Sequence, residues 1–483
     1  MDDLGGLLRR AGNYDAAYTV LTRALTIRGR EMGPDHPDVA QSLNSLGNLF
    51  WEMGRTEEAE DRYQRALRIR ETRLDPLDPE IAVTLNNLGG LRLEAADYMG
   101  ARPYFERALA IREASLGENH PDLAFSLENL GSLHWQSGDA ARARTYYERC
   151  LQIREKVLDA DHPLVGQTLN NLGLTLDDLG EYAAARAAYE RALEIYAKKL
   201  DPDHSHIADT LNNLANLKVV LGDPSGLADA ERAVAIREKI FGPDDPAVAE
   251  ALTTAGVAMM TAGDYAGARE RFERAIAIAE VGGGDRLDLA NNLANLVLAL
   301  SGLNDYEGAR GHLERALAMR ERLLGTNHLL VADSCYNLGA ITRDLGDFAA
   351  GRRYLERSLA IREAALGPDD VATANSMAAI GLLLYYEGKV DEARDLYTRA
   401  LEVQRRKLPT GNPNLMESCY NLACLHAVAG DTEQALRHLR LAVDNGLASP
   451  YVAEDGDLAA LHGNPEFNQL LERILARANA AGQ

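Results

Sequence analysis

The sequence predicts an all-α protein, a solenoid of about eleven helix–turn–helix repeats that ends in a C-terminal capping helix. Three observations predict it: one sequence motif recurs every 41 or 42 residues, apolar residues follow helical spacing within each copy of the motif, and Gly or Pro separates the copies. A fixed period of this length is typical of solenoids. The first arginine of the motif "RALxIR" marks the period, at Arg23, Arg65, Arg107, Arg149, Arg191, Arg232, Arg274, Arg315, Arg357 and Arg399, with Leu441 in the last copy.

The first helix of a copy is clearest between residues 37 and 53. Its apolar face, with the spacing i, i+3, i+4 and i+7, is made by Leu43, Leu46, Gly47 and Phe50. Pro37 suits the first turn because that position needs no backbone N–H, and His36 or Asp35 precedes it as the cap. Gly54 ends the helix.

The second helix of the copy extends to about Leu74, where Asp75 and Pro76 interrupt it. Its helically spaced residues are Ala59, Tyr63, Ala66, Leu67 and Arg70. Because only about three residues join the two helices, they must pack antiparallel. Neither helix can bury its apolar face alone, so each pair needs neighbouring pairs.

These residues resemble the tetratricopeptide repeat signature. A small residue recurs at the place of Ala59, and a helix-ending proline is missing at Glu71. This longer unit, with the text "HPDVA…LNNLG…YxRALxIRE", is similar to kinesin light chains and to many bacterial repeat proteins. The resemblance covers almost the whole chain, and it implies a right-handed superhelix whose first helices line a concave groove.

The pattern divides the chain into three parts. Residues 1–281 hold repeats 1 to 7, with a truncated first helix, and residues 282–445 hold repeats 8 to 11. Residues 446–483 form a C-terminal cap that resembles the closing segment of bacterial repeat arrays. Three consecutive glycines, Gly282–Gly284, predict a hinge between the two arrays.

Composition limits the partners. The formal net charge of −22 argues against nucleic acids and anionic membranes, which require cationic patches. No apolar run is long enough to span a membrane, and no signal peptide precedes the first repeat, so we expect a cytoplasmic protein. The cysteines are too few for a disulfide framework, and we expect buried reduced thiols at Cys150, Cys335, Cys419 and Cys424.

The sequence contains no phosphate-binding loop, no HExxH and no GxSxG, so we expect neither catalysis nor a cofactor. Five histidines share one place in the repeat: His36, His120, His162, His204 and His328. Adjacent repeats lie about 10 Å apart, too far for one metal ion to bridge. We therefore expect these histidines to cap helices.

The remaining constellation is an asparagine ladder on the side of the first helix that faces away from the core. One place in the repeat, the ladder position, is held by Asn87, Asn129, Asn171, Asn213, Asn295 and Asn337. The place before it, the flanking position, is held by Asn86, Asn170 and Asn212. Asparagine is a mediocre helix former, so another role must favour it.

The resemblance implies that these carboxamides bind the backbone of an extended peptide, as asparagine ladders do in kinesin light chains. The alternative is that the amides bond to the next repeat and hold the superhelical pitch. We favour peptide contact for Asn87, Asn129, Asn171 and Asn213, and leave the flanking residues open between the two roles.

Other residues of the groove describe the ligand. Acids predominate there, which favours a neutral to basic peptide; they are Glu52, Glu94, Asp178, Asp209, Glu250, Asp333 and Asp344. The aromatic residues of the groove have two interpretations: they form pockets for the ligand, or they pack between helices. These residues are Trp51, Trp135, Tyr385 and Tyr386. The arginines of "RALxIR" are expected to form solvated charge networks.

The sequence therefore predicts a non-catalytic scaffold that binds extended peptide segments. One alternative is the sensor or scaffold arm of a larger bacterial signalling protein, C-terminal to a kinase or cyclase domain. Another is a self-associating solenoid. We expect a monomer, with stacking through the open N-terminal end as the competing arrangement.

Overall fold

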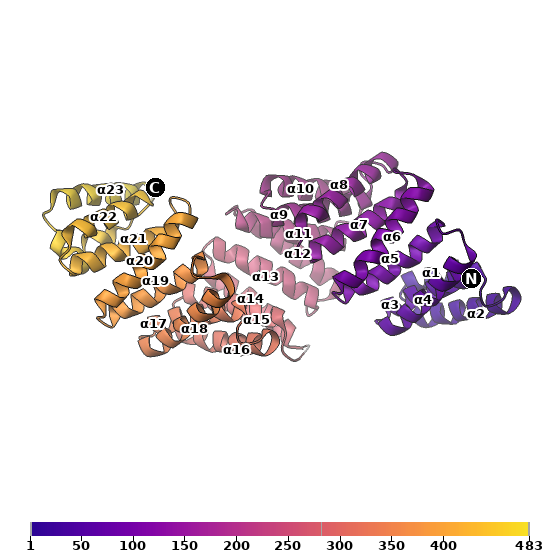
Figure 1. Cartoon of the computed structure of the whole chain (residues 1–483), viewed down its shortest axis with the longest axis horizontal. Coiled ribbons are helices and arrows are strands. Elements are labelled where there is room, and N and C mark those ends of the chain that lie inside the picture. The colour runs from indigo at the N-terminus through magenta and orange to yellow at the C-terminus, as the bar shows by residue number, and fades with distance from the viewer. Residues whose placement is uncertain (1, 282, 482–483) are drawn as a thin grey trace. The chain divides into compact units, whose positions relative to one another are not determined.

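The computed structural model describes residues 2–281 and 283–481, and in them every regular element is a helix. The chain forms two compact units, Met1–Pro243 and Asp244–Gln483 (Figure 1). Unit 1 contains α1 (Asp2–Arg10), α2 (Tyr14–Met32), α3 (Pro37–Glu52), α4 (Thr56–Arg73), α5 (Pro79–Glu94), α6 (Tyr98–Leu116), α7 (Pro121–Gln136), α8 (Ala140–Val157), α9 (Pro163–Asp178), α10 (Tyr182–Lys199), α11 (Ser205–Val220) and α12 (Gly226–Phe241). Unit 2 contains α13 (Pro246–Thr261), α14 (Tyr265–Val281), α15 (Leu287–Gly302), α16 (Tyr306–Leu324), α17 (Leu329–Asp344), α18 (Phe348–Leu366), α19 (Val371–Tyr386), α20 (Val390–Lys407), α21 (Pro413–Val428), α22 (Thr432–Asp444), the 3₁₀ turns η1 (Pro450–Ala453) and η2 (Gly456–Leu461), and α23 (Pro465–Ala481).

The first helices of the repeats begin where the sequence predicts. The five histidines are N-caps, and the Nδ1 atom of each accepts the backbone N–H two residues later, at 3.1–3.2 Å. His36, for example, accepts from Asp38 and leads into α3. The capping role of these histidines is confirmed.

In six of the described helix pairs, the helices approach closely because a glycine of the first helix faces an aromatic ring of the second. In another pair Gly339 faces Leu355 instead. A Cβ atom at Gly173 would lie 2.5 Å from Cε1 of Tyr189, which is closer than real contacts allow. The sixth repeat has Ala215 and Ala230 in these two places, and both are fully buried. There the larger first-helix residue faces the smaller second-helix residue, so the summed volume is partly kept.

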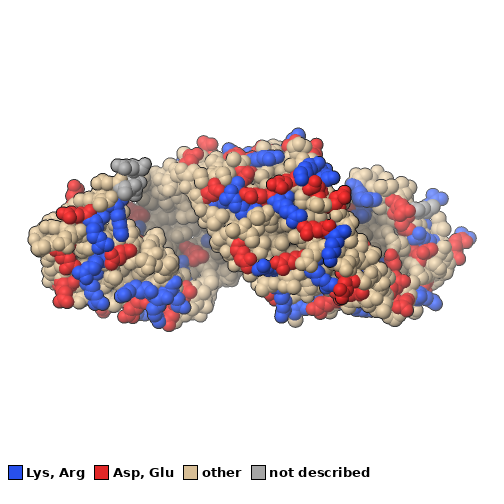
Figure 2. Space-filling view, turned by 90° about the horizontal axis from the view of Figure 1, so that it is seen from above, with Lys and Arg blue, Asp and Glu red and all other residues tan. Residues whose placement is uncertain are grey.

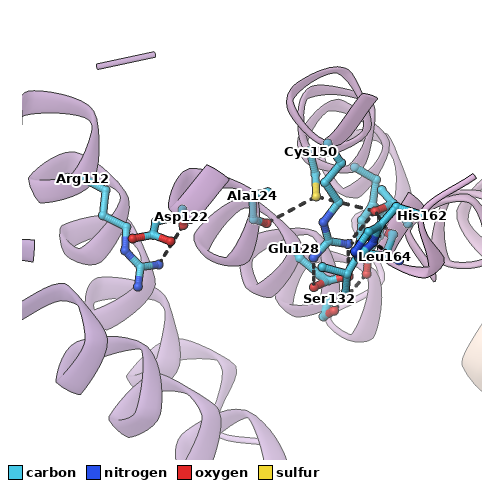
Figure 3. A network of polar contacts seen from close by, with 11 residues as sticks. Arg112, Asp122, Ala124, Glu128, Ser132, Cys150, His162 and Leu164 are labelled. Atoms are coloured by element: carbon cyan, nitrogen blue, oxygen red, sulfur yellow. Dashed lines mark hydrogen bonds and ion pairs between the residues drawn. The ribbon is translucent and has the colours of Figure 1, made fainter. Parts of the chain in front are cut away.

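Between pairs, the second arginine of "RALxIR" joins one repeat to the next. Arg154 is 2% exposed, and its Nη1 donates to the Leu164 carbonyl at 3.0 Å and to Thr168 Oγ1 at 2.6 Å. Figure 3 shows the equivalent arginine one repeat earlier, Arg112, which lies beside Asp122 and donates to its backbone carbonyl at 3.0 Å. The same place holds the buried residues Arg70, Arg112, Arg237, Arg320 and Arg362. The prediction of solvated charge networks is wrong for these arginines, because the lengthened second helix carries them against the start of the next first helix.

The first arginines of the motif behave as predicted. Arg149, for example, pairs with Glu113 at 2.6 Å, and both side chains are more than one-third exposed. All four cysteines are buried and unpaired.

The C-terminal segment closes the core of unit 2. α23 places Phe467, Leu470 and Ile474 against buried residues of α22, and η2 packs on α21. The predicted capping helix is therefore present. In the described residues no helix combines the length and the apolar character that crossing a bilayer requires.

The three-part division of the chain stays a prediction, and so does the hinge. Along the chain, the boundary between the compact units falls between Pro243 and Asp244, whereas the predicted boundary follows residue 281. Of the three glycines, Gly282 lies outside the described residues. Gly283 and Gly284 have φ angles of 68° and 75°, which favour glycine.

Candidate functional site

The first helices carry the predicted site. We call the surface formed by their partly exposed side chains the first-helix face. The six ladder asparagines are all half-buried there, on α5 (Asn87), α7 (Asn129), α9 (Asn171), α11 (Asn213), α15 (Asn295) and α17 (Asn337). The helical periodicity therefore places them in equivalent positions within each unit.

Two ladder amides contact the preceding repeat. The Nδ2 of Asn87 donates to Asn44 Oδ1 and Asn48 Oδ1, both at 3.1 Å. The Nδ2 of Asn213 donates to Asn170 Oδ1 at 3.1 Å. These bonds hold neighbouring first helices together, and they use the donor side of each carboxamide while leaving its oxygen without a partner among the described residues.

The other ladder residues use less of their capacity. Asn171 Oδ1 accepts a long bond of 3.5 Å from Asn170. The side-chain amides of Asn129, Asn295 and Asn337 make no hydrogen bond with any group that the structure describes. A carboxamide can make about four hydrogen bonds, so each of these residues can still bind water or a ligand.

Two of the three flanking asparagines lie deeper than the ladder asparagines. Asn86 is 8% exposed and Asn212 is 2% exposed. Asn86 donates to Ser126 Oγ of the next repeat at 3.1 Å. Asn170 is half-buried and bonds to both Asn171 and Asn213. Such placement suits a role in repeat-to-repeat contact, which is the alternative that the sequence left open.

The two tryptophans also join successive repeats. The indole N–H of Trp135 donates to Asp178 Oδ2 at 2.6 Å, and Trp51 contacts Glu94 in the same way. Both pairs are 43 residues apart, a regularity that sequence inspection could have found. These contacts favour helix packing over ligand pockets for both rings.

Several acids of the first-helix face pair with the protein's own arginines. Arg237 contacts Asp209 at 3.0 Å, and Arg362 contacts Asp333 at 2.7 Å. Arg343 contacts its neighbour Asp344 at 2.7 Å. Figure 2 shows acids and bases interspersed over one face of the molecule. The charges of these particular acids are thus neutralised within the repeats.

Two neighbouring cavities open on the first-helix face of unit 2. The smaller, about 60 Å³, lies over α17, α19 and α21 and includes Tyr336, Arg343 and Glu417. The larger, about 220 Å³, is walled by tyrosines and by Asp455 and Asp457. Leu382 and Tyr397 border both cavities. Sequence reasoning missed the two aspartates because they lie in the non-repetitive segment after α22.

The chain matches the family model described as "Tetratricopeptide repeat" along most of its length. The matched residues are 1–72, 80–156, 129–198, 206–280, 260–322, 288–348, 328–406 and 380–446. A comparison with curated protein sequences gave no match.

Solved structures resemble this chain at low sequence identity, and one of them, the apo form of RapI, shares its fold. The apo form of RapI is 14% identical, with a TM-score of 0.57 over 78% of this chain and 99% of that chain. Kinesin-light-chain TPR-like repeats from Podosopora anserina are 21% identical, with a TM-score of 0.38 over 43% of this chain and 98% of that chain. BtubC from P. vanneervenii is 20% identical, with a TM-score of 0.39 over 52% of this chain and 94% of that chain.

Proposed function

This chain belongs to the tetratricopeptide repeat family, and we propose that it is a non-catalytic scaffold that binds extended peptide segments of a partner protein. The peptide lies along the first-helix face. Its main chain bonds to the half-buried ladder asparagines, and its side chains are neutral to basic because the protein carries a net charge of −22.

One observation carries this proposal. Asn87, Asn129, Asn171 and Asn213 occupy equivalent places on four successive first helices, and each keeps hydrogen-bonding capacity that no described residue uses. Regularly spaced acceptors and donors suit a peptide backbone, which presents its own N–H and C=O groups at regular intervals. Beneath them, the buried amide of Asn86 donates to Ser126 of the next repeat and so helps to hold the repeats in register.

The test is capture of a partner from host lysate by two variants of the full chain. One variant changes Asn129, Asn171 and Asn213 to alanine. The control changes Gln64, Thr145 and Gln152, which are exposed on second helices, to alanine. Circular dichroism first establishes that both variants are as helical as the original chain.

The proposal predicts that the control retains the captured partner and the ladder variant loses it. Retention by the ladder variant would mean that the asparagines serve the fold alone. Loss by the control alone would move the binding surface to the second helices.

A further inference from the structure

The larger of the two cavities on the first-helix face of unit 2 has aromatic walls and an acidic rim. Tyr385 and Tyr386 come from the end of α19, and Tyr420 comes from the middle of α21. Asp455 and Asp457 reach the cavity from η2 and the residue before it. Tyr386 is 55% exposed, so one wall is open to solvent. The segment after α22 thus covers the end of the first-helix face with two carboxylates.

The Asp455 carboxylate accepts hydrogen bonds, and neither aspartate is paired with a cation in the part of the chain that the structure describes. Tyr420 Oη donates to Asp455 Oδ2, and Asp455 Oδ1 accepts the backbone N–H of Asp457 at 2.9 Å. No Lys, Arg or His of the described residues forms an ion pair with either aspartate. Partly buried carboxylates without a counter-charge are unfavourable, and a cation from outside the protein would relieve this.

Elsewhere in the chain, an arginine of the protein itself lies over a tyrosine and beside an aspartate, as the proposed external cation would. Tyr336 and Tyr420 occupy the same place in repeats two apart, and both lie in the text "SCYNL". Over Tyr336 lies Arg362, its guanidinium carbon 4.8 Å from the ring centroid, and it also contacts Asp333 at 2.7 Å. In the last repeat the residue corresponding to Arg362 is Gly446, so no side chain covers Tyr420 in this way.

We propose that this cavity, the tyrosine–aspartate pocket, binds the guanidinium group of an arginine side chain from the bound peptide. The inference rests on the proposed function, because the pocket lies on the face along which the peptide runs. A planar guanidinium can stack on a tyrosine and donate to carboxylates at the same time. The cavity volume of about 220 Å³ has room for one such side chain.

A metal ion is the competing occupant. Ligand atoms of Cys424, Asp455 and Asp457 lie within 4.8 Å of one another. Burial raises the pKa of the Cys424 thiol, and its Sγ lies 3.8 Å from Asp455 Oδ2, so the sulfur keeps its proton. A metal ion would have to displace that proton, whereas a guanidinium needs only the carboxylates and a tyrosine ring, which the pocket already presents.

The test uses the full chain and two short probes that differ in charge alone. One is acetyl-Gly-Gly-Arg-Gly-Gly-amide, and the other has citrulline, the neutral isostere of arginine, in the third place. Saturation-transfer NMR measures the dissociation constant of each. Asp457→Asn removes one rim charge, and Glu454→Gln removes an exposed charge three residues away as the matched control.

The proposal predicts that the arginine probe binds, that citrulline weakens binding by about tenfold, and that Asp457→Asn does the same while Glu454→Gln does not. Equal binding of the arginine probe to Asp457→Asn and to the original chain would overturn the proposal. The proposal would also be overturned if the arginine probe did not bind, or if the pocket bound Zn²⁺ instead of the arginine probe.

Failure of the pocket can be told apart from failure of the proposed function. If Asp457→Asn leaves arginine binding unchanged while the ladder variant loses its captured partner, the scaffold function stands and only the pocket is wrong. If the ladder variant keeps its partner, the function itself fails.

Discussion

Two arginines of one motif have different roles in the structure. Arg149 and Arg154 begin and end the motif "RCLQIR" on α8, yet the side chain of Arg149 is 37% exposed and Arg154 is buried. Arg154 also forms two bonds with Glu128, at 2.8 and 2.9 Å, on the first helix of its own repeat. It therefore links its own repeat to the next.

We expect Arg154→Ala to lower the free energy of unfolding by about 3 kcal/mol, because it leaves a mostly buried carboxylate without its partner. The matched change Arg149→Ala removes a solvated pair and should cost less than about 1 kcal/mol. Urea unfolding followed by circular dichroism measures both. Equal losses for the two variants would contradict the joining role of the buried arginine.

His438 gives unit 2 a dependence on pH. Burial, reinforced by His426 and nearby arginines, lowers the pKa of His438 to about 4. Between the ordinary value of 6.5 and about 4, the unfolded chain binds the proton and the folded chain does not, so this histidine destabilises the fold as the pH falls. The urea midpoint of His438→Gln should therefore decrease less than that of the original chain between pH 7 and pH 4.5. Parallel decreases would show that His438 titrates normally.

At the scale of the element, the pair α9–α10 depends on Gly173 facing the ring of Tyr189. Gly173→Ala should lower the free energy of unfolding by about 1–3 kcal/mol, since the new methyl group would overlap Tyr189. In the background Tyr189→Ala, which copies the small second-helix residue of the sixth repeat, the same change should cost less. Urea unfolding of the original chain, the two single variants and the double variant gives the coupling free energy between positions 173 and 189. Additive effects of the two changes would refute the dependence on this contact.

The repeating elements were predictable because period, caps and apolar spacing each recur many times. The histidine caps and the helix bounds followed from such repetition. The buried arginines were misjudged because a charged residue on the apolar side of a helix was assigned to solvent by its type. Asp455 and Asp457 were missed because the segment after α22 does not follow the repeat pattern. Nothing in the amino-acid sequence therefore indicates that this segment packs over α21.

At the scale of the whole molecule, the two tryptophans report on unit 1 alone, since Trp51 and Trp135 both lie there. Leu439 is fully buried in unit 2, and Leu439→Ala should cost about 2–5 kcal/mol. In a repeat array stability is coupled mainly between neighbours. We therefore expect the variant to shift the urea midpoint seen by circular dichroism more than the midpoint seen by tryptophan fluorescence. Identical shifts would indicate that the chain unfolds as one cooperative block.

The central claim is that a partner's peptide lies along the first-helix face. Hydrogen–deuterium exchange of the full chain, alone and with its captured partner, tests this most directly. The account predicts added protection in α5, α7, α9 and α11, and little change in α4, α6, α8 and α10. Protection confined to the second helices would contradict it and place the binding surface on the other side of the repeats.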